Sequence, residues 1–388
     1  MKNKKILLVG RASLSLGGKA TGGISKHIDD LSIKLTENNF EVIIWDFTLK
    51  KSYSKSNVRI EGLNYTDIIL GLIYSIFSLN IIFNKSYQYL SLKDKFLIST
   101  QSWKLKNYII EKDINLVHVH SLNRPITHFL KLKFSNIKIF ITDHGFWQKK
   151  GLVLSDNNSI FKKIKKNIEL ATSIITISSF ANAQFKIYKL PTHKNINIPN
   201  PIFLSKIPIK EVHKENIIFF NGFNRSLEIK NFELVIKALK HLSFFENYKL
   251  VAIVNNEAKT FIKSIGVNFQ IEILGAQPWE VVVDLYNKSK ILVVPSKSES
   301  FGLVYLESLS VGTPIVGFHE TVKEFQNKID LDIGETFNSE LENYKDLANK
   351  IESVLTRKYD KHQIRKKIQS KYDWDFSIKK YINLYNCL

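Results

Sequence analysis

Short apolar runs rich in Ile and Val recur along the chain and limit its fold more than any other feature of the sequence. They occupy residues 6–9, 42–45, 116–120, 137–142, 174–178, 217–221, 250–254, 271–274 and 291–295. Each has the length and composition of a strand buried on both faces. Helical patterns lie between many of them, for example at residues 24–36 and 232–242. This alternation predicts an α/β protein whose parallel sheets are covered by helices.

The length of the chain and a group of prolines divide this pattern in two. With 388 residues, the chain exceeds the usual size of one hydrophobic core. Pro199, Pro201 and Pro208 interrupt any periodicity near the middle of the chain. We expect two Rossmann-like domains, residues 1–200 and residues 201–370, with ligands bound in a cleft between the carboxyl ends of their sheets.

The cysteine content and the lengths of two apolar runs indicate in which cellular compartment the protein works. Cys387 is the single cysteine of the chain, so neither a disulfide framework nor a cysteine metal cluster can form within it, as is typical of the cytoplasm. The apolar run at residues 6–9 is too short for a signal peptide. Residues 68–83 are mostly apolar, but they fall short of the roughly 20 residues that span a bilayer. They predict a buried helix or a helix lying in the membrane interface.

The positive charge of the chain is concentrated in its N-terminal half. Residues 1–200 hold 30 Lys and Arg against 13 Asp and Glu, whereas residues 201–388 hold 26 against 23. This asymmetry indicates an anionic membrane or another polyanion as the partner of the first half. Drift of the composition toward Lys, Asn and Ile would give the same numbers without any partner. A nucleic-acid partner is not expected, because no aromatic-rich basic motif accompanies the charge.

Two carboxylates spaced eight residues apart form the strongest motif. Glu299 follows a predicted strand, and Glu307 is the one charge on an otherwise uncharged helical stretch. A ribose would satisfy such a buried carboxylate, because two neighbouring hydroxyls can donate to its two oxygens. The N–H groups of Phe301, Gly302 and Leu303, at the predicted start of the helix, form an anion site for a diphosphate. Glu299 would then face the sugar hydroxyls. In the alternative, Glu307 pairs with a core lysine and Glu299 is solvated.

This spacing resembles the Glu-x7-Glu signature of glycosyltransferase family 4, whose members are retaining enzymes of the GT-B fold. Arg225 and Lys230 follow an apolar strand and resemble the two cations of the family that bind the donor diphosphate. A following helix would add the positive end of its dipole to their charge. An Arg and a Lys five residues apart in a loop are otherwise more often solvated.

The resemblance extends to the N-terminal half. Gly22 and Gly23 lie in a glycine-rich loop similar to the family loop that approaches the donor phosphate and the acceptor, and glycine permits such close approach. The loop fits neither the dinucleotide fingerprint nor a P-loop. His144, at the end of a predicted strand, is similar to the family histidine that contacts the donor sugar; a histidine bonding a loop carbonyl is the alternative. We expect a structural or supporting role for His118 and His120. His27 has no assigned role.

The resemblance covers residues 6–385 and includes the chain's end. The segment from Tyr372 to Tyr385 resembles a C-terminal helix that packs back on the first domain, so residues 371–388 are expected to form it. Residues 50–105 match no part of the family pattern.

The resemblance implies a metal-independent transferase without a cofactor. His144, Arg225, Lys230 and Glu299 would act in catalysis, and the cations and helix amides would stabilise the departing diphosphate. We expect the donor to be a UDP-hexose or UDP-N-acetylhexosamine, and the acceptor a cell-surface glycan or a lipid-linked sugar of a bacterial cell envelope. A nucleotide-sugar 2-epimerase and a non-catalytic partner subunit of the same fold are the alternatives.

A lipid-linked acceptor would place the enzyme on the inner face of the cell membrane. Lys162, Lys163, Lys165 and Lys166 lie in one helical pattern and are the expected contacts with anionic lipid. The apolar residues 68–83 would insert shallowly beside them. A solvated lysine-rich helix face is the alternative.

Overall fold

The computed structural model describes residues 4–20, 22–79, 81, 84–155, 157–222, 227–242, 245–255, 258, 260–262, 267, 269–341 and 343–386. The chain divides into two compact units. Unit 1 comprises Met1–Pro199 and Ile378–Leu388, and unit 2 comprises Asn200–Ser377. The chain therefore returns to unit 1 from residue 378, rather than from residue 371.

Unit 1 is built on an eight-stranded sheet with the order β3-β4-β2-β1-β5-β6-β7-β8, in which all neighbours are parallel except β3 and β4. The strands are β1 (Lys4–Val9), β2 (Phe40–Trp45), β3 (Tyr53–Lys55), β4 (Val58–Glu61), β5 (Leu116–His120), β6 (Lys138–Asp143), β7 (Ser173–Thr176) and β8 (Asn195–Asn197). Successive side chains of a strand point to opposite faces, so β5 sends Val117 and Val119 into one core and His118 and His120 to the other face.

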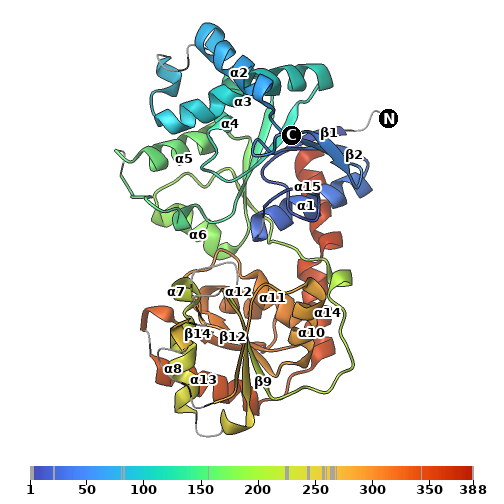
Figure 1. Ribbon diagram of the computed structural model, residues 1–388, viewed down its shortest axis with the longest axis vertical. Coiled ribbons are helices and arrows are strands. Elements are labelled where there is room, and N and C mark those ends of the chain that lie inside the picture. Colours follow the sequence, from blue (N-terminus) through green and yellow to red (C-terminus); the bar gives the residue numbers. More distant parts are fainter. Residues whose placement is uncertain are drawn as a thin grey trace. The chain divides into compact units, whose positions relative to one another are not determined.

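Helices cover both faces of this sheet (Figure 1). Those of unit 1 are α1 (Gly23–Glu37), α2 (Tyr65–Tyr74), α3 (Leu92–Lys112), α4 (Ile126–Lys133), α5 (Ser159–Leu170), α6 (Ser179–Ile187) and the second half of α15 (Trp374–Asn386). The larger core contains buried side chains of α3, α4 and α5 together with alternate residues of the strands. On the opposite face, Tyr385 of α15 packs edge to face on Phe40 and Phe140.

A helical hairpin of α2 and α3 accounts for the segment that the family pattern left unexplained. Asn64 caps α2 in a capping box with Asp67, and a π-helical turn at Ser75–Leu79 extends that helix. Gly71 allows the close packing, because a Cβ there would lie 2.5 Å from the carbonyl oxygen of Ser99 in α3. Within the described residues, no helix is long and apolar enough to cross a membrane.

Unit 2 is built on a six-stranded parallel sheet with the order β11-β10-β9-β12-β13-β14. The strands are β9 (Ile217–Asn221), β10 (Lys249–Ile253), β11 (Ile271–Leu274), β12 (Ile291–Val294), β13 (Ile315–Phe318) and β14 (Gly334–Phe337). The helices are α7 (Leu227–Lys230), α8 (Phe232–His241), α10 (Trp279–Lys288), α11 (Leu303–Ser310), α12 (His319–Ile329), α13 (Tyr344–Thr356) and α14 (Lys361–Tyr372). Helix α8 packs on α13, while α11 packs on α10 and α14 (Figure 1).

The expected α/β class with two parallel sheets is confirmed. All nine predicted strands are present within two residues of their expected ends, and α1 extends the predicted helix by one residue at each end. The short strands β3, β4, β8, β13 and β14 were not expected. Of these, β3 and β8 carry few buried side chains, so their sequences lack the continuous apolar run of a central strand.

Candidate active site

A buried ion pair joins two of the predicted site residues in unit 2. Nζ of Lys230 donates to Oε1 of Glu299 at 2.6 Å, and both side chains are 7% exposed. The hydroxyl of Ser296 donates to the same oxygen at 2.8 Å. Lys230 ends α7, Glu299 lies in the loop after β12, and a backbone hydrogen bond from Lys297 to Ile229 ties the two segments together. The fold thus assembles a cation and an anion from distant parts of the sequence.

The surroundings of Lys230 correct the expectation that it lies in a loop. It is a buried helical residue, and Asn231 turns the chain with a φ of 59° before α8 begins. Gly222 packs closely against the ring of Phe220, because a Cβ there would lie 2.6 Å from Cε1 of that ring, and it would also touch the stem of Lys230. Glu299, expected to face a sugar, bonds to Lys230 in this structure. Arg225 lies outside the described residues.

A second buried carboxylate is held by a chain of hydrogen bonds. The hydroxyl of Tyr286 in α10 donates to Oε2 of Glu307 at 3.1 Å, and it accepts from the side-chain amide of Asn221 at 2.9 Å. Burial and the neighbouring charge of Glu307 raise the pKa of Tyr286 well above its usual value. Glu307 therefore pairs through Oε2 with a tyrosine hydroxyl. No motif in the sequence indicated Tyr286, whereas Asn221 could have been found as a polar residue that ends a buried strand.

The start of α11 differs by two residues from the prediction. Gly302 adopts a φ of 79°, in the left-handed region, so the helix begins at Leu303 instead of Phe301. The ring of Phe301 is buried against Phe325 and Tyr372. The N–H groups of Phe301, Gly302 and Leu303 have no acceptor among the described residues. They remain suited to an anion at a helix N-terminus.

In unit 1, two buried aspartates shape the glycine-rich loop between β1 and α1. Asp46 accepts from the N–H of Ala12 at 3.0 Å, and Asp29 accepts from the hydroxyl of Ser15 at 2.7 Å. Gly22 has a φ of 102°, and a Cβ there would meet nothing within 4 Å. Gly23 is the first residue of α1. The loop therefore presents Gly22 to open space, as the approach of a ligand requires, and its aspartate supports were not predicted.

His144 stands at a tight turn after β6. Oδ1 of the preceding Asp143 accepts from the N–H of Gly145 at 3.2 Å and from that of Phe146 at 2.9 Å. Gly145 has a φ of 109°, which glycine adopts readily. Burial raises the pKa of Asp143 to about 7. This Asx-type turn fixes the backbone that aims the imidazole of His144.

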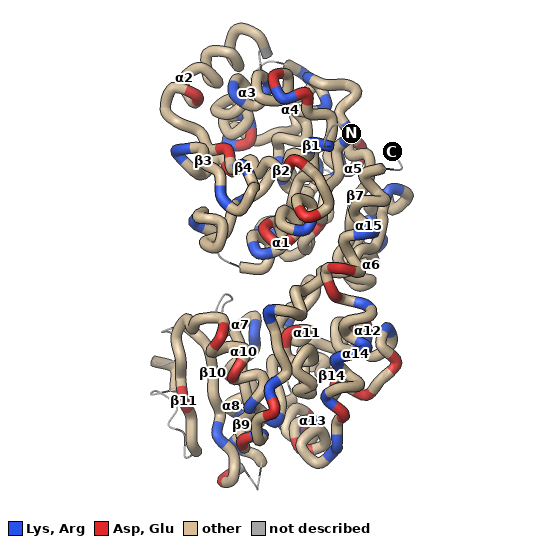
Figure 2. Tube along the Cα trace, turned by 90° about the vertical axis from the view of Figure 1, so that its right-hand side faces the viewer, with Lys and Arg blue, Asp and Glu red and all other residues tan. Residues whose placement is uncertain are grey.

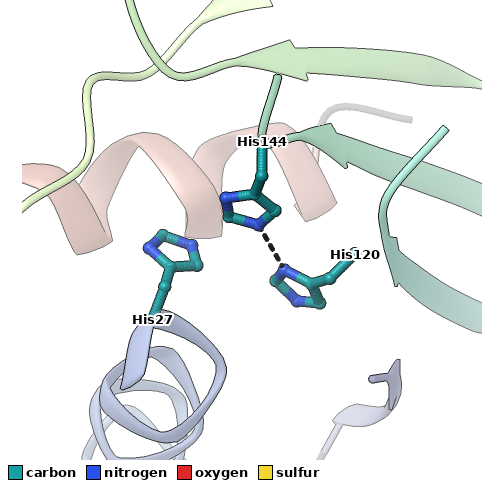
Figure 3. A group of neighbouring side chains, drawn as sticks. All are labelled: His27, His120 and His144. Carbon is teal, nitrogen blue, oxygen red and sulfur yellow. Dashed lines mark hydrogen bonds between the residues drawn. The ribbon is translucent and has the colours of Figure 1, made fainter. Parts of the chain in front are cut away.

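Three histidines converge beside this turn (Figure 3). His27 comes from α1, while His120 and His144 come from the ends of β5 and β6, and all three rings point toward one another. Nδ1 of His120 lies 3.2 Å from Nε2 of His144. Burial lowers the pKa of His27 to about 3 and the pKa values of the other two well below their usual value, so all are neutral. Sequence reasoning found His144 alone as a site residue.

His118 differs from this trio. Its Nδ1 lies 2.7 Å from the hydroxyl of Tyr385, and its Nε2 lies 2.7 Å from the hydroxyl of Thr142. Both ring nitrogens are therefore used inside the fold, as the expected structural role requires.

In each unit the predicted residues lie where an open α/β sheet binds its ligands. The order of unit 1 reverses at β1, and the glycine loop follows β1, while His120 ends β5 and His144 follows β6. The order of unit 2 reverses at β9, and Lys230 and Glu299 follow β9 and its neighbour β12. Ligands bind at the carboxyl ends of strands at such switch points. A cavity of about 290 Å³ in unit 1 lies at the opposite end, against the starts of β1, β5 and β6, and is separate from these residues.

Two family profiles match consecutive parts of the chain. The profile described as Glycosyl transferases group 1 matches residues 205–371, and the profile described as Glycosyltransferase Family 4 matches residues 21–206. The chain belongs to glycosyltransferase family 4. The resemblance drawn from the motifs is thereby confirmed.

Relatives of this family 4 protein include two uncharacterized glycosyltransferases of Methanocaldococcus jannaschii. The first is 28% identical over 184 residues, which make up 44% of the chain and 45% of the relative, so the chain matches less than half of that relative's length. The second is 24% identical over 309 residues, 76% of the chain and 74% of the relative.

Solved structures place the transferase in the GT-B fold. Sucrose-phosphate synthase from Thermosynechococcus elongatus has a TM-score of 0.74 at 16% identity, with 99% of this chain and 98% of that one covered. Anabaena HepE in complex with UDP-glucose has a TM-score of 0.68 at 13% identity, with 99% and 100% covered. At these identities the likeness concerns the fold.

Proposed function

We propose that this family 4 protein is a retaining, metal-independent hexosyltransferase that moves a hexose or N-acetylhexosamine from a UDP-sugar to a cell-surface glycan or a lipid-linked acceptor. The observation that carries the proposal is the buried pair of Lys230, at the end of α7, with Glu299, in the loop that leads to the start of α11. A cation held beside open helix amides is suited to a diphosphate.

The proposed role of these groups is to stabilise the leaving nucleoside diphosphate. As the bond between the sugar carbon C1 and the phosphate oxygen breaks, negative charge grows on that oxygen. Lys230, Arg225 and the amides of Phe301 to Leu303 would meet this charge with preorganised positive potential, which is worth most in a water-poor site. Glu299 would then accept hydrogen bonds from sugar hydroxyls, and Glu307 would accept from the ribose.

Retention follows if the acceptor attacks from the face that the diphosphate leaves. The acceptor oxygen forms the new bond to C1, and its proton passes to the departing phosphate oxygen, so no protein base is needed. His144 would contact the donor sugar from unit 1, and Gly22 and Gly23 would lie along the donor phosphate and the acceptor. No resident metal or cofactor enters this scheme.

The proposal of a UDP-sugar is supported by the HepE complex with UDP-glucose, a protein of the same fold. Thermal unfolding with UDP-, GDP- and ADP-sugars tests it, since a ligand at 100 times its dissociation constant stabilises by about 2.7 kcal/mol. Stabilisation by a GDP- or ADP-sugar alone would contradict the base assignment. Incubation with a UDP-sugar alone excludes the rival activity if no C2 epimer forms.

Glu307→Gln tests the ribose role. A neutral amide cannot accept from both ribose hydroxyls, so titration calorimetry should find weaker binding of UDP, with the fold preserved in circular dichroism. An unchanged affinity would remove Glu307 from the ribose site. Failure of every donor to bind the wild-type protein would instead favour a non-catalytic partner subunit.

The proposed anionic membrane partner requires a corrected contact surface. Lys163 of α5 is buried, and its Nζ lies 2.8 Å from both carboxylate oxygens of Asp94, so it cannot reach lipid. Lys162, Lys165 and Lys166 remain exposed or half-exposed. The spacing of the four lysines did not reveal this difference in exposure. Lys163 lies on the face of α5 that packs inward.

Helix α2 and its π-helical extension supply the apolar part of the surface. Exposed side chains recur there at helical spacing and include Ile69 at 57%, Ile73 at 48%, Ile76 at 62% and Phe77 at 83%. Figure 2 shows that α2 carries almost no charged residues. Such an exposed stripe favours a partner, and an interfacial lipid layer fits its uninterrupted apolar character. The protein would then work in the cytoplasm, at the inner face of the membrane.

Co-sedimentation with phosphatidylglycerol vesicles tests this surface. Ile73→Ser combined with Phe77→Ser should lower pelleting at every salt concentration. Replacement of Lys162, Lys165 and Lys166 by serine should lower only the salt-sensitive part of vesicle binding. Each lysine is expected to contribute about 1 kcal/mol to the free energy of that binding. Leu341→Ser, at a 67% exposed residue of unit 2, is the matched control. Equal pelleting of all these proteins would refute the membrane surface.

A further inference from the structure

The histidine trio of unit 1 has the spacing of a metal-binding group. His27, His120 and His144 each offer one ring nitrogen, and these three nitrogens lie within 4.8 Å of one another. The ring centroids are separated by 5.6 Å for His27 and His120, 5.3 Å for His27 and His144, and 5.5 Å for His120 and His144. Three imidazoles bound tetrahedrally to Zn²⁺ at its usual Zn–N length of about 2.0–2.1 Å have centroids roughly 5 Å apart and nitrogens roughly 3.3 Å apart. The facing nitrogens of His120 and His144 already have this spacing, at 3.2 Å, and a movement of the His27 ring toward them would complete the geometry.

The chemistry of the three side chains fits the same ligand. Neutral imidazole is the form that binds late first-row divalent ions, whereas Mg²⁺ and Ca²⁺ require oxygen ligands. His120 and His144 share one proton along a 3.2 Å contact. A cation that binds both facing nitrogens requires the N–H proton between them to move to the other nitrogen of the ring that carries it, so no net proton is lost.

The contacts around the trio also distinguish it from an ordinary buried cluster. Nε2 of His120 is buried without a hydrogen-bond partner among the described residues, whereas both nitrogens of the neighbouring His118 are bonded. His144 is only half-buried, which gives an ion a route from solvent. Figure 3 shows the three rings converging on one point from three different elements.

We propose that His27, His120 and His144 form a Zn²⁺ site in unit 1. Three histidine ligands leave the fourth position of a tetrahedral ion open to water or to an anionic ligand. The site joins α1 to the ends of β5 and β6. Bound Zn²⁺ therefore links the glycine-loop helix to the strand ends that flank it.

The proposed ion lies outside the chemistry proposed for sugar transfer. Bound Zn²⁺ would occupy a ring nitrogen of His144. Because the proposed function has His144 contact the donor sugar, Zn²⁺ would then act as a reversible inhibitor of transfer. Ion binding itself is measured without any sugar, so its outcome is independent of the proposed function.

The test uses the full chain without a histidine tag, stripped of metal by a chelator and then titrated with Co²⁺ or Zn²⁺. We expect one ion per chain after dialysis and the visible absorption of tetrahedral Co²⁺. His27→Gln, His120→Gln and His144→Gln should each weaken binding more than about 100-fold, beyond the 10–100-fold effect of losing an outer-sphere contact. His128→Gln, at another buried histidine of unit 1, should leave it unchanged.

X-ray absorption at the zinc edge of the wild-type protein gives the ligand set without relying on any variant. Scattering from three imidazoles supports the site. Loss of the ion on dialysis of the wild-type protein would overturn the proposal, as would binding that survives in all three folded variants. A zinc spectrum dominated by oxygen ligands would equally refute it.

Discussion

Nζ of Lys230 lies 2.6 Å from Oε1 of Glu299, and both side chains are buried. Lys230 therefore serves two purposes in unit 2: it neutralises a buried carboxylate in this structure, and it is the proposed contact of the donor diphosphate. A substitution at this position must affect stability as well as turnover.

Lys230→Ala should lower turnover by roughly 10² to 10³, as the loss of one donor of an oxyanion-type site does. It should also destabilise unit 2 by about 3–5 kcal/mol, because Glu299 is left as an unpaired buried charge. Urea unfolding and a product assay measure the two effects. The double variant Lys230→Met with Glu299→Leu should recover stability without activity. Near-normal turnover in folded Lys230→Ala would show that the lysine has no part in transfer.

Tyr286→Phe should weaken UDP binding about tenfold or more, since a hydrogen bond to a charged group contributes about 1.5–3 kcal/mol. The tyrosine hydroxyl holds Oε2 of Glu307 and accepts from Asn221. Titration calorimetry with UDP measures the effect. Asn221→Ala should lower the affinity for UDP less, because it removes only the hydrogen bond from Asn221 to Tyr286 and leaves the bond from Tyr286 to Glu307 in place. If Tyr286→Phe bound UDP as the wild type does, orientation of Glu307 would not matter for the nucleotide.

Gly302→Ala should impair donor binding and stability together. A Cβ at this left-handed residue would lie 2.4 Å from Cδ2 of Tyr305, and overpacking of this kind costs about 1–3 kcal/mol. Tyr305 itself joins α11 to the sheet, because its hydroxyl donates to the carbonyl of Val294 and accepts from the N–H of Phe318. Gly275→Ala is the matched control, since a Cβ there meets nothing within 4 Å. Equal thermal stability of the two variants would refute the packing argument.

Unit 1 should lose stability between about pH 6.5 and pH 4 in part through His128. Burial lowers the pKa of His128 from 6.5 to about 4, and the nearby charge of Lys166 acts in the same direction. Below pH 6.5 the unfolded chain gains a proton that the folded chain does not, so the free energy of unfolding falls until pH 4. Its Nδ1 bonds to the hydroxyl of Tyr89, and glutamine at this position keeps a polar partner. His128→Gln should flatten the pH profile of chemical unfolding in this window; an unchanged profile would contradict the assignment.

The sequence predicted those features that arise from continuous local patterns. Buried parallel strands are nearly unbroken apolar runs, so most central strands of both sheets were found, although the short buried strand β13 was missed. Edge strands such as β3 bury little and left no such run. Helix α11 was placed two residues early, because Gly302 adopts the left-handed conformation and the helix begins only at Leu303.

Side-chain partners depend on which elements the fold brings together, and local spacing does not contain that information. Glu299 and Lys230 were each predicted, but their contact was not. Lys163 appeared equivalent to its neighbouring lysines, until the packing of α5 on α3 brought it to Asp94. His27 and His120 had no motif of their own, and only the meeting of α1 with two strand ends relates them to His144.

The return of the chain to unit 1 at Ile378 has a consequence for how the protein is made. Tyr381 and Tyr385 of α15 contact His27, His118 and Phe140, and therefore complete one face of the first sheet. A ribosome delivers all of Asn200–Ser377 before it releases these tyrosines. The second unit is thus the first whose whole sequence is available for folding. The nascent first unit must wait, with that face of its sheet uncovered, until the final turns of α15 emerge.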